Sequence, residues 1–263
     1  MTLNRHQNLI VPPLLAIQFL TRVPVPGLSR LRPDDVQAGL VRAVMWFPLA
    51  GGLVGLVSAG ILIGALELWP RMVAVLIALI VEARLTGAFH EDAVADFCDG
   101  FGGGSTSQRI HEIMKDSRIG AYGSVGLMLA LGLRAALLVA LPEHLILPAL
   151  VASCAFGRWL AVVPRAVLPS PPGFEGMASR IAAGTGRRQL AGASLVILPF
   201  VLPFAWLAPV AAIGALLAAA VFIWWLCAFL HRHLGGVTGD CLGFAAYVGQ
   251  LLVLLAASAR WLM

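Results

Sequence analysis

The chain is poor in charged residues, which make up only 12 % of its 263 residues, about half the share in soluble domains. Hydrophobic residues account for 60 %, and the mean hydropathy is +0.90. This composition excludes an ordinary soluble domain and predicts a chain that crosses a membrane several times. The apolar runs do not alternate with polar residues, so helices rather than barrel strands are expected.

Other features are also missing. The four cysteines show no paired spacing, which argues against a disulfide framework and favours free thiols in a reducing compartment. The beginning of the chain has no pattern of a cleavable signal peptide. No nucleic-acid-binding module is recognisable, so we attribute the net charge of +5 to basic loops at an anionic inner leaflet.

Seven runs are long and apolar enough to cross a bilayer as helices, for which about 20 residues are needed. We therefore predict an all-α, polytopic membrane helix bundle in a single domain, 1–263, with polar cytoplasmic loops. Six or eight spans are alternatives, because only Ala208 and Pro209 divide two of the runs. The apolar stretch 9–20 is short and contains two prolines, so an interfacial or re-entrant helix is expected there. The predicted spans are 43–66, 69–89, 121–142, 145–164, 190–208, 209–230 and 243–262.

Positive charge is distributed very unevenly between the two sides of this topology. With the N-terminus inside, thirteen of the basic residues fall in inside segments, two fall outside and three lie within spans. Because basic residues favour the cytoplasmic side, all long polar loops are expected to face the cytoplasm. The outside pair is Arg71 and Arg260, and the three within spans are Arg84, Arg134 and Arg158.

One segment, from Phe89 to Gly123, concentrates the polar chemistry of the chain. Six of the thirteen acidic residues and the only lysine, Lys115, lie in it. Asp92, Asp96 and Asp99 are spaced i, i+4 and i+7, which places them on one face of a helix. Such carboxylates repel one another unless a cation lies between them, and oxygen ligands suit Mg²⁺ or Mn²⁺. A solvated acidic helix end is the alternative.

Further polar groups follow this stripe. Lys115 and Arg118 flank Asp116, a pattern that suits a metal ligand among phosphate-neutralising cations; a membrane-interface anchor is the alternative. The run Gly102–Gly104 could expose backbone N–H groups to a phosphate or act as a hinge. Asp240 stands behind a glycine-rich turn at the start of the last span.

Two more residues have open interpretations. Arg158 lies within a predicted span and therefore needs a partner or a water-filled cavity. His90 projects away from the aspartate stripe and is either a base, a phosphate contact or an ordinary hydrogen-bonding histidine. Aspartates, cations and glycine-rich turns on one face together indicate metal-dependent phosphoryl transfer.

The order of these motifs resembles one family, the adenosylcobinamide-GDP ribazoletransferases, also called cobalamin-5′-phosphate synthases. The resemblance rests on residues 87–92, 95–96, 99–100 and 115–120, with 18–26 before them and 235–240 after them. It implies a multi-pass enzyme of the bacterial inner membrane, with its active site facing the cytoplasm. The implied reaction joins adenosylcobinamide-GDP to α-ribazole or its 5′-phosphate with Mg²⁺, or Mn²⁺ instead, and releases GMP.

The chain departs from the family pattern in two places. Ala93-Val94 stands where Gly-Leu is usual, and residues 244–247 follow Gly243 where a small residue and later a glutamate are common. The second departure leaves a carboxylate role for Tyr247 or Gln250 in doubt.

We predict that the metal is held by Asp92, Asp96, Asp99, Asp116 and Asp240. The predicted catalytic residues are His90, Lys115 and Arg118, and the predicted substrate-binding residues are Arg22, Arg158, Gly236 and Thr238.

The alternatives are a CDP-alcohol phosphotransferase-like or prenyltransferase-like membrane enzyme, or a cation-coupled transporter. A transporter would place carboxylates mid-span, whereas here they collect in loops on one face. The expected partners are the two substrates and the lipid bilayer, without nucleic acid. Small-residue helix faces permit a homo-oligomer or a complex with other cobalamin-pathway enzymes.

Overall fold

A computed structural model of the chain describes residues 7–28, 32–173 and 184–259. Every regular element in these ranges is a helix, so the predicted all-α class is confirmed. The elements, in chain order, are α1 Gln7–Leu20, α2 Pro33–Ala43, η2 Val44–Trp46, α3 Phe47–Leu66, α4 Arg71–Thr86, α5 Phe89–Gly103, α6 Ser107–Met114, α7 Ala121–Ala140, η3 Glu143–Leu145, α8 Ile146–Val167, α10 Arg187–Val196, α11 Leu198–Leu207, α12 Pro209–Leu234 and α13 Gly239–Ser258.

Five helical segments are long and apolar enough to cross a membrane, and the number is up to seven if each of two bent helix pairs is one span. The seven predicted runs therefore all correspond to helices. The run predicted at 190–208 is not one straight helix, because α10 and α11 meet at an angle of 52°. The N-terminal α1 has only 14 residues, too few to span a bilayer.

The other bent pair consists of α4 and α5. Here α5 leaves α4 at an angle of 87°, and the bend is made by Gly87 and Ala88, whose φ angles are +72° and +57°. Glycine adopts such a left-handed conformation without steric cost, so Gly87 ends α4 at this position. α5 carries four acidic residues and turns away from the apolar α4, so the two helices are not one straight span.

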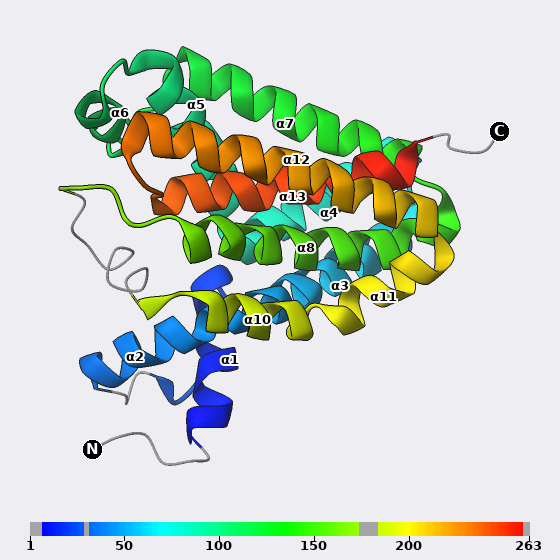
Figure 1. Ribbon diagram of the computed structural model, residues 1–263. Coiled ribbons are helices and arrows are strands. Elements are labelled where there is room, and N and C mark those ends of the chain that lie inside the picture. The colour runs from blue at the N-terminus through cyan, green and yellow to red at the C-terminus, as the bar shows by residue number, and fades with distance from the viewer. Residues whose placement is uncertain (1–6, 29–31, 174–183, 260–263) are drawn as a thin grey trace.

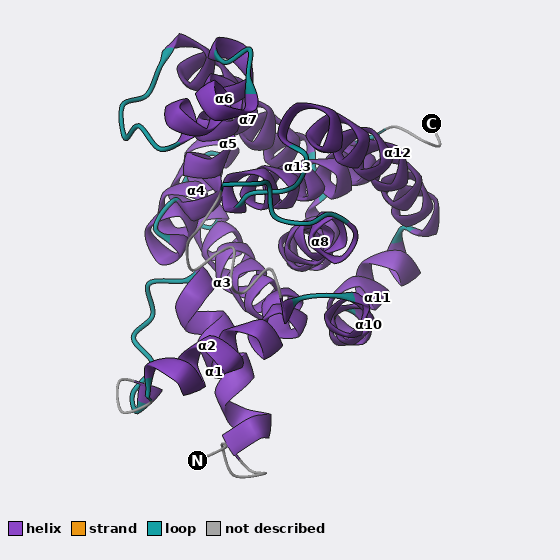
Figure 2. Cartoon of the chain, turned by 60° about the vertical axis from the view of Figure 1, so that its left-hand side comes forward, coloured by secondary structure: helices purple, strands orange, loops and turns teal. Residues whose placement is uncertain are grey.

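The long helices form a bundle around α8, which packs most extensively against α3 and α13 (Figures 1 and 2). Small residues allow these close approaches. A Cβ added to Gly51 of α3 would lie 2.4 Å from the carbonyl oxygen of Cys154, and one added to Gly157 would lie 2.3 Å from that of Ala246. Gly51 and Gly157 therefore allow close helix packing.

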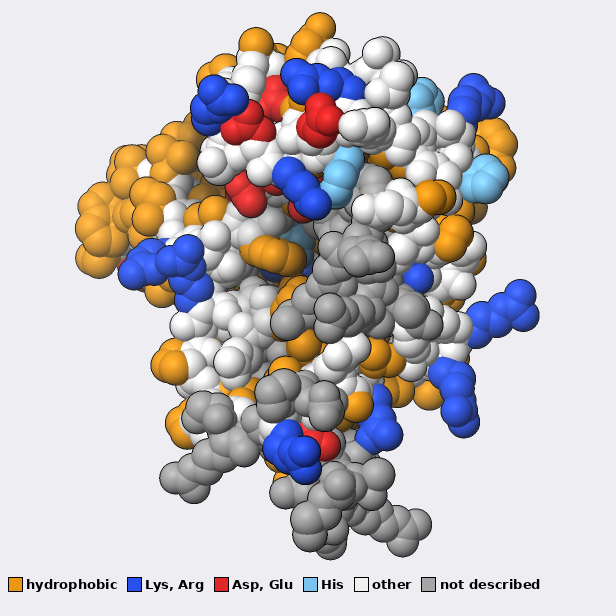
Figure 3. Space-filling view, turned by 90° about the vertical axis from the view of Figure 1, so that its left-hand side faces the viewer, with side chains coloured by type: hydrophobic (Ala, Val, Ile, Leu, Met, Phe, Trp, Pro, Cys, Tyr) orange, Lys and Arg blue, Asp and Glu red, His pale blue; other side chains and the backbone are white. Residues whose placement is uncertain are grey.

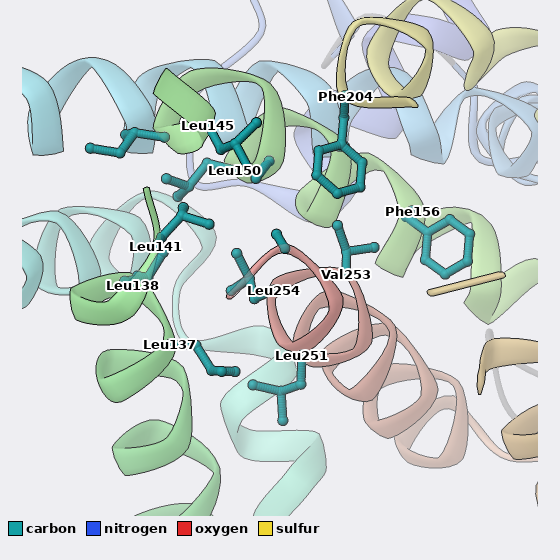
Figure 4. Packing of buried hydrophobic residues seen from close by; sticks show 14 of the residues in the cluster. Leu137, Leu138, Leu141, Leu145, Leu150, Phe156, Phe204, Leu251, Val253 and Leu254 are labelled. Carbon is teal, nitrogen blue, oxygen red and sulfur yellow. The ribbon is translucent and has the colours of Figure 1, made fainter. Parts of the chain in front are cut away.

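The largest cluster of buried apolar residues joins α3, α4, α7, α8, α11, α12 and α13. Leucines at the end of α7 pack against α8, η3 and α13, with Phe204 of α11 above them (Figure 4). The polar segments collect at the opposite end, at the left in Figure 1, where α1, α2, α6 and the turn before α13 lie. This division leaves one end of the bundle available for chemistry.

Candidate active site at the polar end of the bundle

The bend after α4 directs α5, which carries the three predicted aspartates, across the end of the bundle. Asp92 is exposed, Asp96 is half-buried and Asp99 is buried along α5. Figure 3 shows this end face on, with most acidic side chains in its upper part and basic side chains spread over the face. The helical spacing of the three carboxylates is as the sequence predicts.

Asp240, in the first turn of α13, lies close to these aspartates although it is far from them in the sequence. A close contact between α5 and α13 makes this possible, since a Cβ on Gly243 would lie 2.4 Å from the Cβ of Ala93. Burial, together with the carboxylates of Asp92, Asp240 and Asp99, raises the pKa of Asp96 to about 7. In the part of the chain that the structure describes, no basic side chain forms an ion pair with Asp92, Asp96 or Asp240. The three carboxylates, which we call the aspartate cluster, thus concentrate negative charge that a cation would relieve.

The cluster fits a cation shared with a substrate better than a cage made by protein alone. Within the described ranges, no three His, Cys, Asp or Glu side chains lie so that they could hold a metal ion by themselves. Mg²⁺ usually binds one or two protein carboxylates and completes its coordination with water and substrate phosphates. The donor chemistry of the aspartate cluster is therefore compatible with Mg²⁺ when a phosphate is present.

Asp99 is engaged differently from the other members of the stripe. Its two carboxylate oxygens accept hydrogen bonds from the backbone N–H groups of Gly120, at 2.7 Å, and Gly123, at 2.8 Å, at the start of α7. A Cβ on either glycine would lie within 2.5 Å of the carboxylate. Asp99 therefore ties α5 to α7, and the helix N-terminus stabilises its negative charge.

Asp116 lies on the loop between α6 and α7 and is paired with Arg118. The Arg118 guanidinium donates to both carboxylate oxygens, the shortest distance being 2.7 Å from Nη2 to Oδ2. These hydrogen bonds lower the pKa of Asp116 to about 2. Lys115 and Arg118 are exposed, and Asp116 is not among the groups that shift the pKa of Asp96. The structure thus does not bring this loop into the aspartate cluster.

The glycine-rich turn before α13 has a structural function. A Cβ on Gly236 would lie 2.5 Å from the carbonyl oxygen of Pro169, and the N–H of Val237 donates to that oxygen at 2.9 Å. Thr238 is the N-cap of α13, where its hydroxyl accepts a hydrogen bond from the N–H of Cys241. Gly236 and Thr238 thereby fix the first turn of α13, which carries Asp240.

A partly open cavity of about 100 Å³ lies beside the cluster, and His90 and Arg158 both line it. The exposed fractions of their side chains are 3 % and 1 %. Arg158 donates to the carbonyl oxygen of Cys154 at 3.3 Å, while its Nε–H has no partner. Burial, with Arg158 and Arg134 nearby, holds the pKa of His90 well below its usual value, so this imidazole is neutral.

Arg22, the remaining predicted substrate residue, is exposed next to the bend. Its backbone N–H donates to the carbonyl oxygen of Leu85 at 2.7 Å, and its side chain packs where a Cβ of Gly87 would be. The segment 18–26 therefore meets the α4–α5 bend.

Two other features differ from the sequence-based expectations. The run Gly102–Gly104 is not a phosphate-binding loop, since Gly102 and Gly103 belong to α5 and Gly102 packs against the ring of Tyr122.

A buried ion pair between Glu82 and Arg134 was not predicted. The Arg134 Nη2 lies 2.7 and 2.8 Å from the two Glu82 oxygens, Ser58 donates to the same carboxylate at 2.8 Å, and Glu91 lies 3.8 Å from Nη1. Charged residues in two predicted spans are the signal that could have indicated it.

Comparison with known proteins gives consistent matches over nearly the whole chain. A sequence model of the family described as cobalamin-5-phosphate synthase matches residues 12–258. An adenosylcobinamide-GDP ribazoletransferase of Ralstonia nicotianae is 40 % identical over 91 % of this chain and 92 % of its own length. Proteins of the same name are 39 % identical in Leptothrix cholodnii, over 94 % and 93 % of the two chains, and 40 % identical in Sinorhizobium medicae, over 91 % and 92 %. No solved structure gives a significant match.

Proposed function

The chain belongs to the cobalamin-5-phosphate synthase family, and on this premise we propose that it performs the reaction for which its relatives are named. It is an enzyme of cobalamin synthesis that transfers the adenosylcobinamide-phosphate group of adenosylcobinamide-GDP to α-ribazole or α-ribazole 5′-phosphate. The product is adenosylcobalamin or its 5′-phosphate, and GMP is released. The observation that carries the assignment in this molecule is the convergence of Asp92, Asp96 and Asp240 at one end of a membrane bundle.

The reaction breaks the phosphoanhydride bond of the donor and forms a new phosphoester bond to the acceptor. A hydroxyl oxygen of the ribazole attacks the phosphorus that is bonded to the cobinamide side. The bond from this phosphorus to the bridging oxygen breaks, and that oxygen leaves with GMP. The hydroxyl proton passes to a base, for which the neutral imidazole of His90 has the required protonation state.

We propose that Asp92, Asp96 and Asp240 hold the divalent cation, which neutralises diphosphate charge when bound. Asp99 holds α5 against α7 through its two N–H contacts and positions the other carboxylates. Lys115 and Arg118 lie on the exposed loop outside the aspartate cluster, and their predicted role in neutralising phosphate charge stays a prediction.

The proposed location is the bacterial inner membrane, with the aspartate cluster on the cytoplasmic side. The positive-inside distribution supports this orientation, because the inside segments hold the great majority of basic residues. Of these residues, Arg5, Arg30 and Arg180 lie outside the described ranges, as does Arg260 on the other side. A cytoplasmic site also gives access to a nucleotide-linked substrate.

The decisive experiment measures GMP release by the detergent-purified protein, supplied with adenosylcobinamide-GDP and α-ribazole, with Mg²⁺ or with EDTA. We expect release that requires both the acceptor and the cation, and restoration by Mn²⁺. Acceptor-independent release would indicate a hydrolase. No release from protein with a cooperative melting transition would refute the assignment and return attention to the other membrane transferases and to transport.

A further inference from the structure

We propose that the cavity beside the aspartate cluster is the binding site of the acceptor, and that it holds the aromatic base of the ribazole. This inference rests on the proposed function and adds the location of one substrate. The cavity lies between the end of α1, α2, the start of α3, the start of α5, α8 and the first two turns of α13. Its ligand class is a planar aromatic base joined to a pentose.

The size of the cavity selects the smaller substrate. Its volume is about 100 Å³, comparable with a cavity of about 150 Å³ that accepts benzene. Binding sites for drug-sized ligands are roughly 300–1,000 Å³. The inner part of this partly open cavity therefore takes part of a flat aromatic base, whereas a whole corrin ring or nucleotide exceeds it.

The lining has the chemistry that an aromatic base requires. Phe19, Phe47 and Phe89 contribute rings: Phe19 stacks on Phe47 with centroids 5.7 Å apart, and Phe89 meets Phe19 edge-on at 5.7 Å. Aromatic pairs of these kinds stabilise beyond their apolar contact area. A planar base entering beside them would extend the same stack.

One buried polar group marks where a hydrogen-bonding part of the ligand would lie. Arg158 is 1 % exposed, lines the cavity, and has an Nε–H without a partner. A buried unpaired donor is costly, so a ligand oxygen at this position would be favoured. The oxygen is either a pentose hydroxyl or a phosphate oxygen of the acceptor, and Arg165 lines the same cavity on the same face of α8.

The cavity also lies where an acceptor must be for the transfer. Gly239 and Gly243, which line it, flank Asp240 in α13, and Phe89 and His90 lie just before Asp92 in α5. The cavity and the aspartate cluster are thus on two sides of the same contact between Ala93 and Gly243. A base in the cavity would direct its pentose toward the proposed diphosphate position, past the imidazole of His90.

The test fills the cavity without changing any charged residue. Ala161, on α8, lines the cavity and is 8 % exposed, so Ala161→Leu places three more carbons in it. Ala152→Leu is the matched control, since this alanine lies on the same helix but lines a second, apolar cavity of about 310 Å³ among α8, α10, α11, α12 and α13. Leu242→Phe, from the α13 wall, is a second filling variant in case the first does not fold.

The measurements are equilibrium dialysis of α-ribazole and of α-ribazole 5′-phosphate in the absence of donor, and KM for each substrate in GMP release. We expect the filling variants to raise Kd and KM for both acceptors at least about tenfold, with KM for adenosylcobinamide-GDP unchanged. Ala152→Leu should leave all three values unchanged. The same dialysis with Arg158→Met identifies the oxygen that Arg158 contacts. A larger loss of affinity for the phosphorylated acceptor would identify a phosphate oxygen, and equal losses would identify a pentose hydroxyl.

The two hypotheses fail in different ways. If the wild-type protein releases no GMP, the proposed function is wrong. If it does release GMP but both folded filling variants keep the wild-type KM for the acceptor, or raise only the KM for the donor, the acceptor site lies elsewhere.

Discussion

The buried ion pair between Glu82 and Arg134 gives the sharpest prediction about stability. Their exposed fractions are 3 % and 1 %, and they join α4 to α7 inside the bundle. Glu82→Gln keeps the size and one acceptor oxygen but leaves the Arg134 guanidinium with only Glu91, 3.8 Å away, as an acidic partner among the described residues. Removing one member of a buried pair costs about 3–5 kcal/mol, because the other charge stays buried.

This cost is large enough to measure by thermal unfolding in detergent. At about 2–4 °C of Tm for each kcal/mol in a chain of this size, the variant should melt roughly 6–20 °C below the wild type. Cys154 and Cys241 are buried and free, whereas Cys98 and Cys227 are half-buried. With Cys98 and Cys227 replaced by serine in all variants, reaction with a thiol-specific fluorophore reports unfolding. Replacing both charges, Glu82→Leu with Arg134→Met, should restore part of the lost stability.

The matched control is Glu112→Gln, which makes the same change at an exposed ion pair with Arg109 and should leave Tm unchanged. The reasoning is refuted if Glu82→Gln melts within error of the wild type, or if the double variant melts below Glu82→Gln. Either result would mean that the pair does not hold α4 and α7 together.

Three further predictions concern the site and the contacts that position it. Asp96→Asn should lower GMP release by at least about a hundredfold, while membrane insertion and Tm are retained. Near-normal turnover would remove Asp96 from the proposed cation site, and so would an equal loss in the control Glu112→Gln. Gly123→Ala should destabilise the protein by about 1–3 kcal/mol, because the new Cβ would lie 2.2 Å from Asp99 Oδ2 and 2.8 Å from the carbonyl oxygen of Ala95. The control is Gly132→Ala on the same helix, whose Cβ would have nothing within 4 Å and which should leave the stability unchanged. Gly236→Ala should reduce turnover by displacing the turn that carries Asp240, since its Cβ would meet backbone atoms of residues 169–171. Gly64→Ala, in open space, is the control. Wild-type activity in Gly236→Ala would show that the turn tolerates the shift.

Much of the fold could be predicted because its signals are local. Apolar runs long enough to cross a bilayer need no knowledge of their neighbours, and each predicted span is helical in the structure. The stripe of Asp92, Asp96 and Asp99 follows from the helical repeat alone. The bends at Gly87 and between α10 and α11 were not predicted, because they depend on how the helices pack.

The membrane class, the helical elements, the family and the candidate site residues could be predicted from the sequence, since composition, periodicity and motif order are properties of neighbouring residues. Which of the candidate site residues lie together depends on the packing of distant segments. This packing brings Asp240 to Asp96 across 144 positions, turns Asp99 toward the start of α7, and places Arg158 in the wall of a cavity. These outcomes depend on close helix contacts, at Ala93–Gly243 above all, and such contacts are set by side-chain packing between segments far apart in the chain.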